Sequence, residues 1–164
     1  MRQNLMVFIF LMIPFSLVAQ MTAENGAVMV PIDKLFKGMK QGDSSLVHEA
    51  FAKAVTMATI AIDKDGKPSI KHESTLDGFL KAVGTPHSEV WSEMIWDTKI
   101  EIDGNLAQAW APYAFYIGKK FSHCGVDAFQ LFKGADGAWK IFHLADTRQK
   151  EGCQVPGKIS EQFK

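Results

Sequence analysis

The sequence predicts a single α+β domain in which helices cover one face of a curved, mainly antiparallel sheet. Three observations predict this class: two short helical patterns come first, a third follows a hairpin, and the chain from residue 90 onward is nearly all strand. Tight turns join the strands, which favours antiparallel pairing. Because 18 Lys+Arg balance 18 Asp+Glu, a nucleic-acid-binding surface built by bulk charge is excluded.

Three helices are predicted from spacing and capping residues. The first is expected to begin at Pro31, because proline is favoured in a first turn and apolar residues then recur at helical spacing. A second follows, capped by Asp43 or Ser44. A third follows Ser74, which together with Asp77 resembles a capping box.

The predicted strands form three hairpins. They are expected over residues 55–62 with the stretch around residue 70, over 90–102 with 105–117, and over 122–133 with 138–147. The second hairpin turns at Asp103-Gly104, and such a dipeptide between alternating runs is the strongest local hairpin signal.

Both faces of the predicted sheet carry apolar side chains. In the strand that starts at Ser122, one parity contains Phe129 and Leu131 and the other contains Val126 and Phe132. One face should therefore meet the helices and the other a second subunit, since neither can be left wet. We expect a homodimer.

The first twenty residues predict a cleaved secretory signal peptide. Arg2 is the only charge before Glu24, a long apolar run follows it, and small residues lead up to Ala19. The alternative is a membrane anchor, but the run is shorter than the roughly 20 apolar residues of a spanning helix, and Pro14 interrupts it. We therefore expect a periplasmic or secreted protein that is free of the membrane after cleavage.

The resulting division of the chain has four parts. They are a signal peptide at 1–20, a flexible tail at 21–29, the α+β domain at 30–150 and a C-terminal tail at 151–164.

Export favours a disulfide between Cys124 and Cys153. The alternative is a buried Cys124 and an inert, mobile Cys153. A metal site is not expected, because a lone cysteine pair lacks the close Cys or His spacing of zinc ligands.

Four segments resemble the nuclear-transport-factor-2-like, SnoaL-like superfamily. They are Asp103–Ala107, Tyr113–Phe115, Cys124–Leu131 and Asp136–Ile141. The resemblance covers roughly residues 30–150. It implies a cone-shaped roll of cystatin-like topology, with three N-terminal helices inside a strongly curved sheet and an apolar pocket at the open end. It also implies a dimer.

The resemblance is less specific for activity. The superfamily includes isomerases, dehydratases, polyketide cyclases, transport adaptors and domains without known catalysis. No position matches a named enzyme's set residue by residue, so no catalytic residue is carried over. The resemblance predicts a kind of pocket, and the chemistry has to come from the residues themselves.

Asp127 and His123 are candidate catalytic residues on one strand face. A last hairpin with Lys133 opposite Ala138 places Asp127 on one face with Leu144, Asp146 and Arg148. Asp127 then lies among apolar side chains, which would raise its pKa and suit a general acid or base. The alternative is an Asp127 paired with Arg148 or His123 at the rim. His123 lies on the same face of this strand.

Aromatic residues are the candidate ligand-binding groups. They are Trp96, Trp110, Tyr113 and Phe115 on the long hairpin and Phe129 on the next strand. Such rings line small-molecule pockets, although core packing explains them equally well. Tyr113 is also a candidate catalytic residue, because Pro112 beside it marks a bulge or edge that could turn its phenol toward the pocket.

These observations predict an exported domain that binds a small apolar or amphipathic molecule and uses no cofactor. The alternative is a cofactor-free lyase or isomerase, in which Asp127 or His123 moves a proton and Tyr113 steadies negative charge. A third class is an interaction module whose pocket is vestigial. Nucleic acid is not an expected partner.

Overall fold

The computed structural model describes residues 15–73 and 75–164. The helices are α1 (Phe15–Gln41), α2 (Ser44–Ala50), α3 (Asp77–Gly84) and α4 (Gly157–Ser160), followed by a short 3-10 helix (Glu161–Phe163). The strands are β1 (Phe51–Ile62), β2 (Pro68–Glu73), β3 (Trp91–Ile95), β4 (Lys99–Asp103), β5 (Leu106–Ile117), β6 (Lys120–Lys133) and β7 (Trp139–Arg148).

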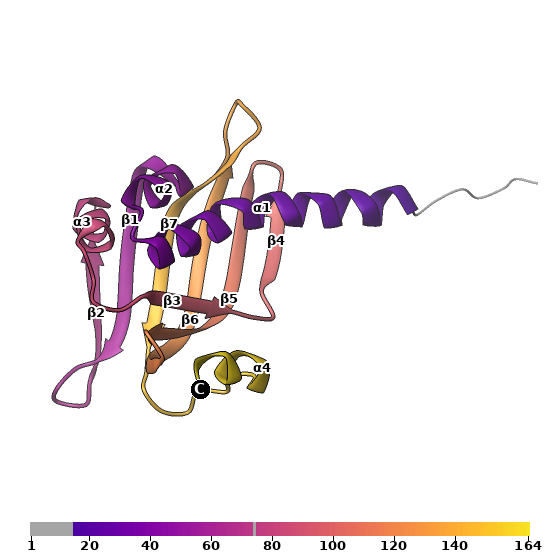
Figure 1. Cartoon of the computed structure of the whole chain (residues 1–164). Coiled ribbons are helices and arrows are strands. Elements are labelled where there is room, and N and C mark those ends of the chain that lie inside the picture. Colours follow the sequence, from indigo (N-terminus) through magenta and orange to yellow (C-terminus); the bar gives the residue numbers. More distant parts are fainter. Residues whose placement is uncertain (1–14, 74) are drawn as a thin grey trace, which may run out of the picture.

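The seven strands form one open, curved sheet, and α1 lies across its inner face (Figure 1). Their order is β2-β1-β7-β6-β5-β3, and β4 also pairs with β5. All pairs are antiparallel except β1 with β7, which are parallel. The predicted α+β class is therefore confirmed, with a sheet that is mixed at this one pair. The turn residues could not predict the pairing of β1 with β7, because the strands β2 to β6 lie between them in the sequence.

α1 is longer than predicted. The expected flexible tail at 21–29 and the helix start at Pro31 are wrong, because the helix runs through both. Pro31 lacks the N–H that an interior helix position uses, but Val28, Ile32 and Leu35 are buried on one stripe against the sheet. Packing of this stripe outweighs the lost hydrogen bond.

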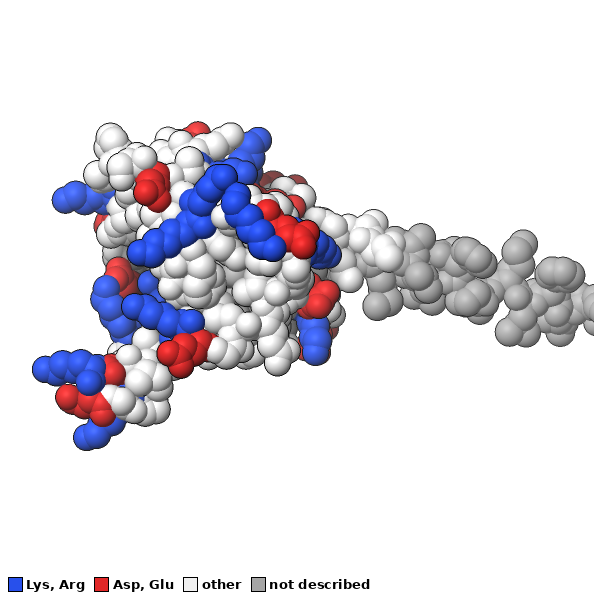
Figure 2. Space-filling view, turned by 60° about the horizontal axis from the view of Figure 1, so that its bottom comes forward, with Lys and Arg blue, Asp and Glu red and all other residues white. Residues whose placement is uncertain are grey.

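The predicted signal peptide falls largely outside the described residues. Residues 1–14 are not described, and residues 15–20 form the first turns of α1. Within the described part of the chain, no helix combines the length and the apolar character that a membrane crossing requires. On the face shown in Figure 2, basic and acidic side chains are interspersed, as expected from the balanced composition.

The two short helices follow the predicted stripes. Asp43, one of the two predicted candidates, caps α2 by accepting a hydrogen bond from the backbone N of Leu46 at 2.9 Å. α3 begins without a side-chain cap, and Ser74, the first residue of the expected capping box, lies outside the described residues. Both helices bury apolar residues, among them Val47 and Val83.

The first arm of the long hairpin is broken. Residues 90–102 were expected to form one strand, but β3 and β4 pair separately with β5. The break contains Asp97 at a positive φ of 46°, and the backbone N of Trp96 donates to Pro112 O at 3.2 Å. The sheet bends at this point, opposite the proline that the sequence marked as a bulge or edge.

The register of β6 with β7 differs from the prediction at the turn. Lys133 pairs with Trp139 instead of Ala138, and a bulge follows between Gln130 and Leu131. The bulge adds one residue on β7 and so restores the expected parity further along. Asp127 consequently pairs with Asp146, on the face where the sequence had placed both.

The C-terminal segment packs on the outer face of the sheet and is not a free tail. Cys124 and Cys153 are joined by a disulfide, which holds the segment near β6. Ile159 is buried, and the ring of Phe163 stacks on Tyr116 with centroids 3.7 Å apart. The other end of the outer face stays open, with Trp110 53% exposed.

Candidate functional site

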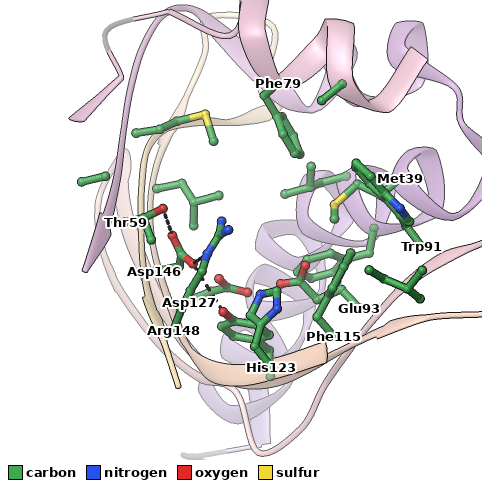
Figure 3. A pocket seen from close by; sticks show the side chains of 18 residues that line it. Met39, Thr59, Phe79, Trp91, Glu93, Phe115, His123, Asp127, Asp146 and Arg148 are labelled. Atoms are coloured by element: carbon green, nitrogen blue, oxygen red, sulfur yellow. Dashed lines mark hydrogen bonds and ion pairs between the residues drawn. The ribbon is translucent and has the colours of Figure 1, made fainter. Parts of the chain in front are cut away.

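A cavity of about 300 Å³ lies between the inner face of the sheet and the helices α1 and α3 (Figure 3). Its helical wall is apolar. The side chains that α1 and α3 contribute are Leu35, Phe36, Met39, Phe79 and Ala82. The floor is formed by β1, β3, β5, β6 and β7. Such a combination of apolar walls with a few polar groups is typical of small-molecule sites.

The polar side chains gather at one end of this cavity. Strand alternation brings Tyr113 of β5, Asp127 of β6 and Asp146 of β7 to the same inner face, because Asp127 is paired with Ala111 on one side and Asp146 on the other. Glu93 reaches the cluster from β3. Four strands thus supply the polar end.

Asp146 is saturated with hydrogen bonds. It accepts from Thr59 Oγ1 at 2.6 Å, from Arg148 Nε at 2.6 Å and from the Tyr113 hydroxyl at 3.3 Å. The Tyr113 hydroxyl also donates to Thr147 O at 2.9 Å. Asp146 and Arg148 therefore form an oriented ion pair on the cavity floor.

Asp127 and Glu93 form the second element of the polar end. Asp127 is only 3% exposed, and burial raises its pKa well above the usual value, with the neighbouring charge of Glu93 adding to the rise. Burial also raises the pKa of Glu93, to about 7, although hydrogen bonding with Asp127 opposes this. The two carboxyl groups therefore hold a proton between them near neutral pH.

No donor reaches one oxygen of this pair. Asp127 Oδ2 is buried and has no hydrogen-bond partner among the described residues. A buried polar atom of this kind costs free energy unless something binds to it. The cavity therefore contains an unfilled hydrogen-bonding position at its polar end.

His123 lines the cavity but is not bonded to the acids. Its Nδ1 lies 3.0 Å from Ser122 Oγ, and its ring packs against Tyr113 and Phe115 with centroids 5.7 and 5.1 Å away. Burial lowers the pKa of His123, and the charge of Arg148 adds to this. The ring is therefore neutral at pH 7.

The three candidate catalytic residues Asp127, His123 and Tyr113 all line this one cavity. Tyr113 differs in character from the expectation, because burial and the charge of Asp146 raise the pKa of its phenol. Its hydroxyl proton already serves Thr147 O and Asp146. Asp127 is the member of the three with bonding capacity to spare.

The candidate ligand-binding aromatics separate into two groups. Tyr113 and Phe115 line the cavity. Trp110 does not, because its position on β5 has the opposite parity and its side chain is exposed on the outer face. Trp96 packs against the outer cluster under the C-terminal segment, and Phe129 is buried in the core at 1% exposure. These three residues are not part of the lining of this cavity.

Several lining residues were not predicted as site residues. Glu93 and Trp91 lie on β3. The sequence predicted one continuous strand over β3 and β4, and the break between these strands changes which side chains point to the inner face. Asp146 and Arg148 were on the correct predicted face, and their alternation with Asp127 was the available signal. The helical residues Phe36 and Phe79 look like ordinary core positions in sequence.

The described residues contain no group of three or more His, Cys, Asp or Glu side chains placed to hold a metal ion. The carboxyl groups of the polar end are arranged for hydrogen bonding and proton sharing.

Known proteins of similar structure share the architecture of this chain. No protein-family model and no curated protein sequence matches the chain. Among solved structures, it is similar to an NTF2-like protein of unknown function from Shewanella baltica OS155, with 21% identity and a TM-score of 0.57 over 79% of this chain and 97% of that one.

Two further solved structures are similar to the chain. A proposed ketosteroid isomerase from Shewanella frigidimarina NCIMB 400 has 19% identity and a TM-score of 0.54, over 73% of this chain and 94% of that one. A proposed dehydratase of the NTF2-like family from Streptomyces avermitilis has 12% identity and a TM-score of 0.58, over 79% and 98%. These likenesses confirm the predicted resemblance at the level of architecture: the chain has the NTF2-like, cystatin-like fold.

Proposed function

We propose that this protein binds a small organic molecule in the cavity beneath α1 and α3. The observation that carries the proposal is Asp127 Oδ2, a buried oxygen that has no hydrogen-bond partner among the described residues and belongs to a residue that lines a cavity with apolar walls. A bound molecule would bury its apolar part against the helices and place a polar group at this oxygen.

A ligand screen with a blocked cavity tests the proposal. The panel consists of one-ring and two-ring aromatic compounds that carry an amine, a hydroxyl or a carboxylate, and binding is read as a rise in melting temperature. Ala82→Phe on α3 should fill the cavity and abolish the rise. Ala135→Phe, in the exposed turn before β7, is the matched control and should keep it. Absence of any stabilised compound with the unaltered protein would refute the proposal.

A second candidate function is cofactor-free proton transfer, and the shared proton of Glu93 and Asp127 favours it. With a carbonyl ligand, ionised Glu93 would take a proton from the carbon beside the carbonyl while Asp127 gives its proton to the carbonyl oxygen, which yields an enol. Return of a proton to another carbon, with Asp127 recovering its own, completes an isomerisation. A pKa near 7 suits both directions of transfer.

Hydrogen–deuterium exchange tests this candidate without knowledge of the substrate. The bicyclic ketone 2-tetralone is incubated with the protein in D₂O, and loss of its α-proton signals is followed by NMR. Exchange faster than in buffer, reduced by Glu93→Gln and by Asp127→Asn, is expected. Equal exchange rates for these variants and the unaltered protein would exclude the carboxyl pair as the acid and base.

The two solution properties expected from the sequence remain proposals. Removal of residues 1–20 would leave a chain that starts within α1, and the disulfide fits an oxidising compartment. Mass measurement of the protein from periplasm and medium tests whether residues 1–20 are removed.

The proposed dimer would use the open end of the outer face, around Trp110, as the surface that binds a second copy.

A further inference from the structure

We propose that the ligand of this cavity carries a protonated amine on an apolar ring body, and that the amine contacts Asp127 and Glu93. This inference rests on the proposed small-molecule binding and specifies its chemistry. It follows from the balance of charges at the polar end, from the open position at Asp127 and from the shape of the apolar wall.

The first step is a count of charged groups. Three acidic residues and one arginine are among the described residues that line the cavity. They are Glu93, Asp127, Asp146 and Arg148. Arg148 is already bonded through Nε to Asp146 at 2.6 Å. Glu93 and Asp127 therefore form no ion pair with a described cation, although the charge of Arg148 acts on both of them.

The second step concerns the other groups that face this pair. Tyr113 of β5 uses its hydroxyl proton on Thr147 O, and His123 of β6 is neutral because burial lowers its pKa. The side chains that α1, α3 and β1 contribute to the lining are uncharged. No described side chain of the lining therefore forms an ion pair with Asp127 or Glu93.

The third step is the state of Asp127 itself. It is 3% exposed, and no donor reaches Oδ2, so water screens its charge poorly. An ammonium group brings a positive charge and three N–H donors on one atom. It can bond to the open oxygen of Asp127 and to Glu93 together, and the proton held by the pair leaves to solvent as the amine enters.

The alternatives fit this end of the cavity less well. A ligand carboxylate would add a fourth acidic group beside Asp127, and its possible partner Arg148 has a side chain that is 52% exposed and already paired. A hydroxyl would supply one donor but no charge. The amine satisfies both the hydrogen-bonding position and the charge excess.

The apolar wall sets the body of the ligand. The rings of Phe36, Phe79, Trp91 and Phe115 line the cavity, and Phe79 and Trp91 lie across it from Asp127 and Asp146 (Figure 3). A volume of about 300 Å³ lies at the small end of known ligand sites. One ring or two fused rings with a short amine arm match this space.

Three indole compounds that differ only in the end group test the inference. Binding of tryptamine, tryptophol and indole-3-acetate is measured by isothermal titration calorimetry at pH 6 and pH 8, in two buffers of different ionisation heat. We expect tryptamine to bind about tenfold more tightly than tryptophol, and more tightly at pH 8 than at pH 6. Its binding should release protons, because the amine stays charged over this range while the carboxyl pair ionises.

Variants locate the effect. Asp127→Asn and Glu93→Gln should each weaken tryptamine about tenfold while tryptophol changes less than about twofold, which also shows that the cavity is intact. Glu101→Gln, on β4 and outside the cavity, is the control and should change neither. These readouts separate a direct contact with the amine from a general loss of structure.

The outcomes separate the inference from the proposed function. Tryptophol or indole-3-acetate binding as tightly as tryptamine would overturn the amine preference and leave small-molecule binding in place. Unchanged tryptamine affinity in both acid variants would overturn the assigned contact. If none of the three compounds and none of the wider aromatic panel binds, both the inference and the proposed function fail.

Discussion

Asp127 and Asp146 are direct register partners on β6 and β7, yet their surroundings are opposite. Asp146 accepts three hydrogen bonds, one of them from Arg148. Asp127 Oδ2 accepts none from the described residues. The same pair of strands therefore presents one carboxylate that the protein itself hydrogen-bonds and one carboxyl oxygen without a hydrogen-bond partner among the described residues.

Stability should fall as the pH rises through the titration of Glu93. Its pKa is raised to about 7 in the folded protein from the ordinary value of 4.5, so the folded state binds more protons than the unfolded state between these pH values. The free energy of unfolding should decrease between pH 4.5 and pH 7, by on the order of 2 kcal/mol. Urea titrations over this range measure it.

Glu93→Gln removes this titration and should flatten the decrease. Glu101→Gln, an exposed acid on β4, should keep the slope of the unaltered protein. Equal slopes for the Glu93 variant and the unaltered protein would show that the titration belongs to another group.

Reduction of the disulfide should destabilise the protein. Cys124 and Cys153 close a loop with a sequence separation of 29, for which the chain-entropy relation gives about 3–4 kcal/mol. Urea unfolding with and without a phosphine reductant measures the change. The variant with both cysteines replaced by serine should match the reduced protein and should not respond to the reductant, and a response in that variant would point to another target.

Alanine substitution of two glycines on α1 should have opposite effects. At Gly38 a Cβ would lie 2.7 Å from Val47 Cγ2 and 2.9 Å from its backbone N, so α1 and α2 would have to move apart. Gly38→Ala should therefore destabilise by about 1–3 kcal/mol. At Gly26 nothing lies within 4 Å, and Gly26→Ala should stabilise by about 0.5–1 kcal/mol.

Thermal and urea unfolding of the two glycine variants measure these changes. Because both substitutions are made in one helix, propensity alone predicts the same sign for both. A gain in stability at Gly38 would contradict the close approach of α1 and α2.

The outer face should mediate a dimer. Leu106, Trp110 and Phe132 are exposed there at 51%, 53% and 40%, while the C-terminal segment covers the other end. Trp110→Lys should convert the dimer to a monomer in light scattering coupled to size exclusion. It should leave the monomer folded, because the ring has few contacts to lose.

Val30→Lys is the control for the dimer surface, since Val30 is equally exposed at 59% but belongs to α1. It should leave the dimer intact. A monomeric unaltered protein, or dissociation by both variants alike, would reject this face as the interface.

Local sequence signals determined much of the architecture. The Asp103-Gly104 and Gly134–Gly137 turns mark two hairpins that the structure contains, and Asp43 marks the start of α2. These signals are local, because a tight turn or a cap depends on a few neighbouring residues. The same is true of the inward parity of Asp127.

Long-range packing decided the rest. Residues 21–29 are helical because the sheet offers their apolar stripe a surface, and Glu24 is held by Lys133 at 2.7 Å. Glu93 lines the cavity because β3 and β4 pair with β5 as separate strands. Trp110 does not line it because its side chain points to the outer face. The sequence by itself determined the start of α2, two of the hairpin turns and the face of Asp127. Only the tertiary structure decided that Glu93 joins Asp127 and Asp146 in one cavity, because β3 has to pack against β5 before its carboxyl group can meet theirs.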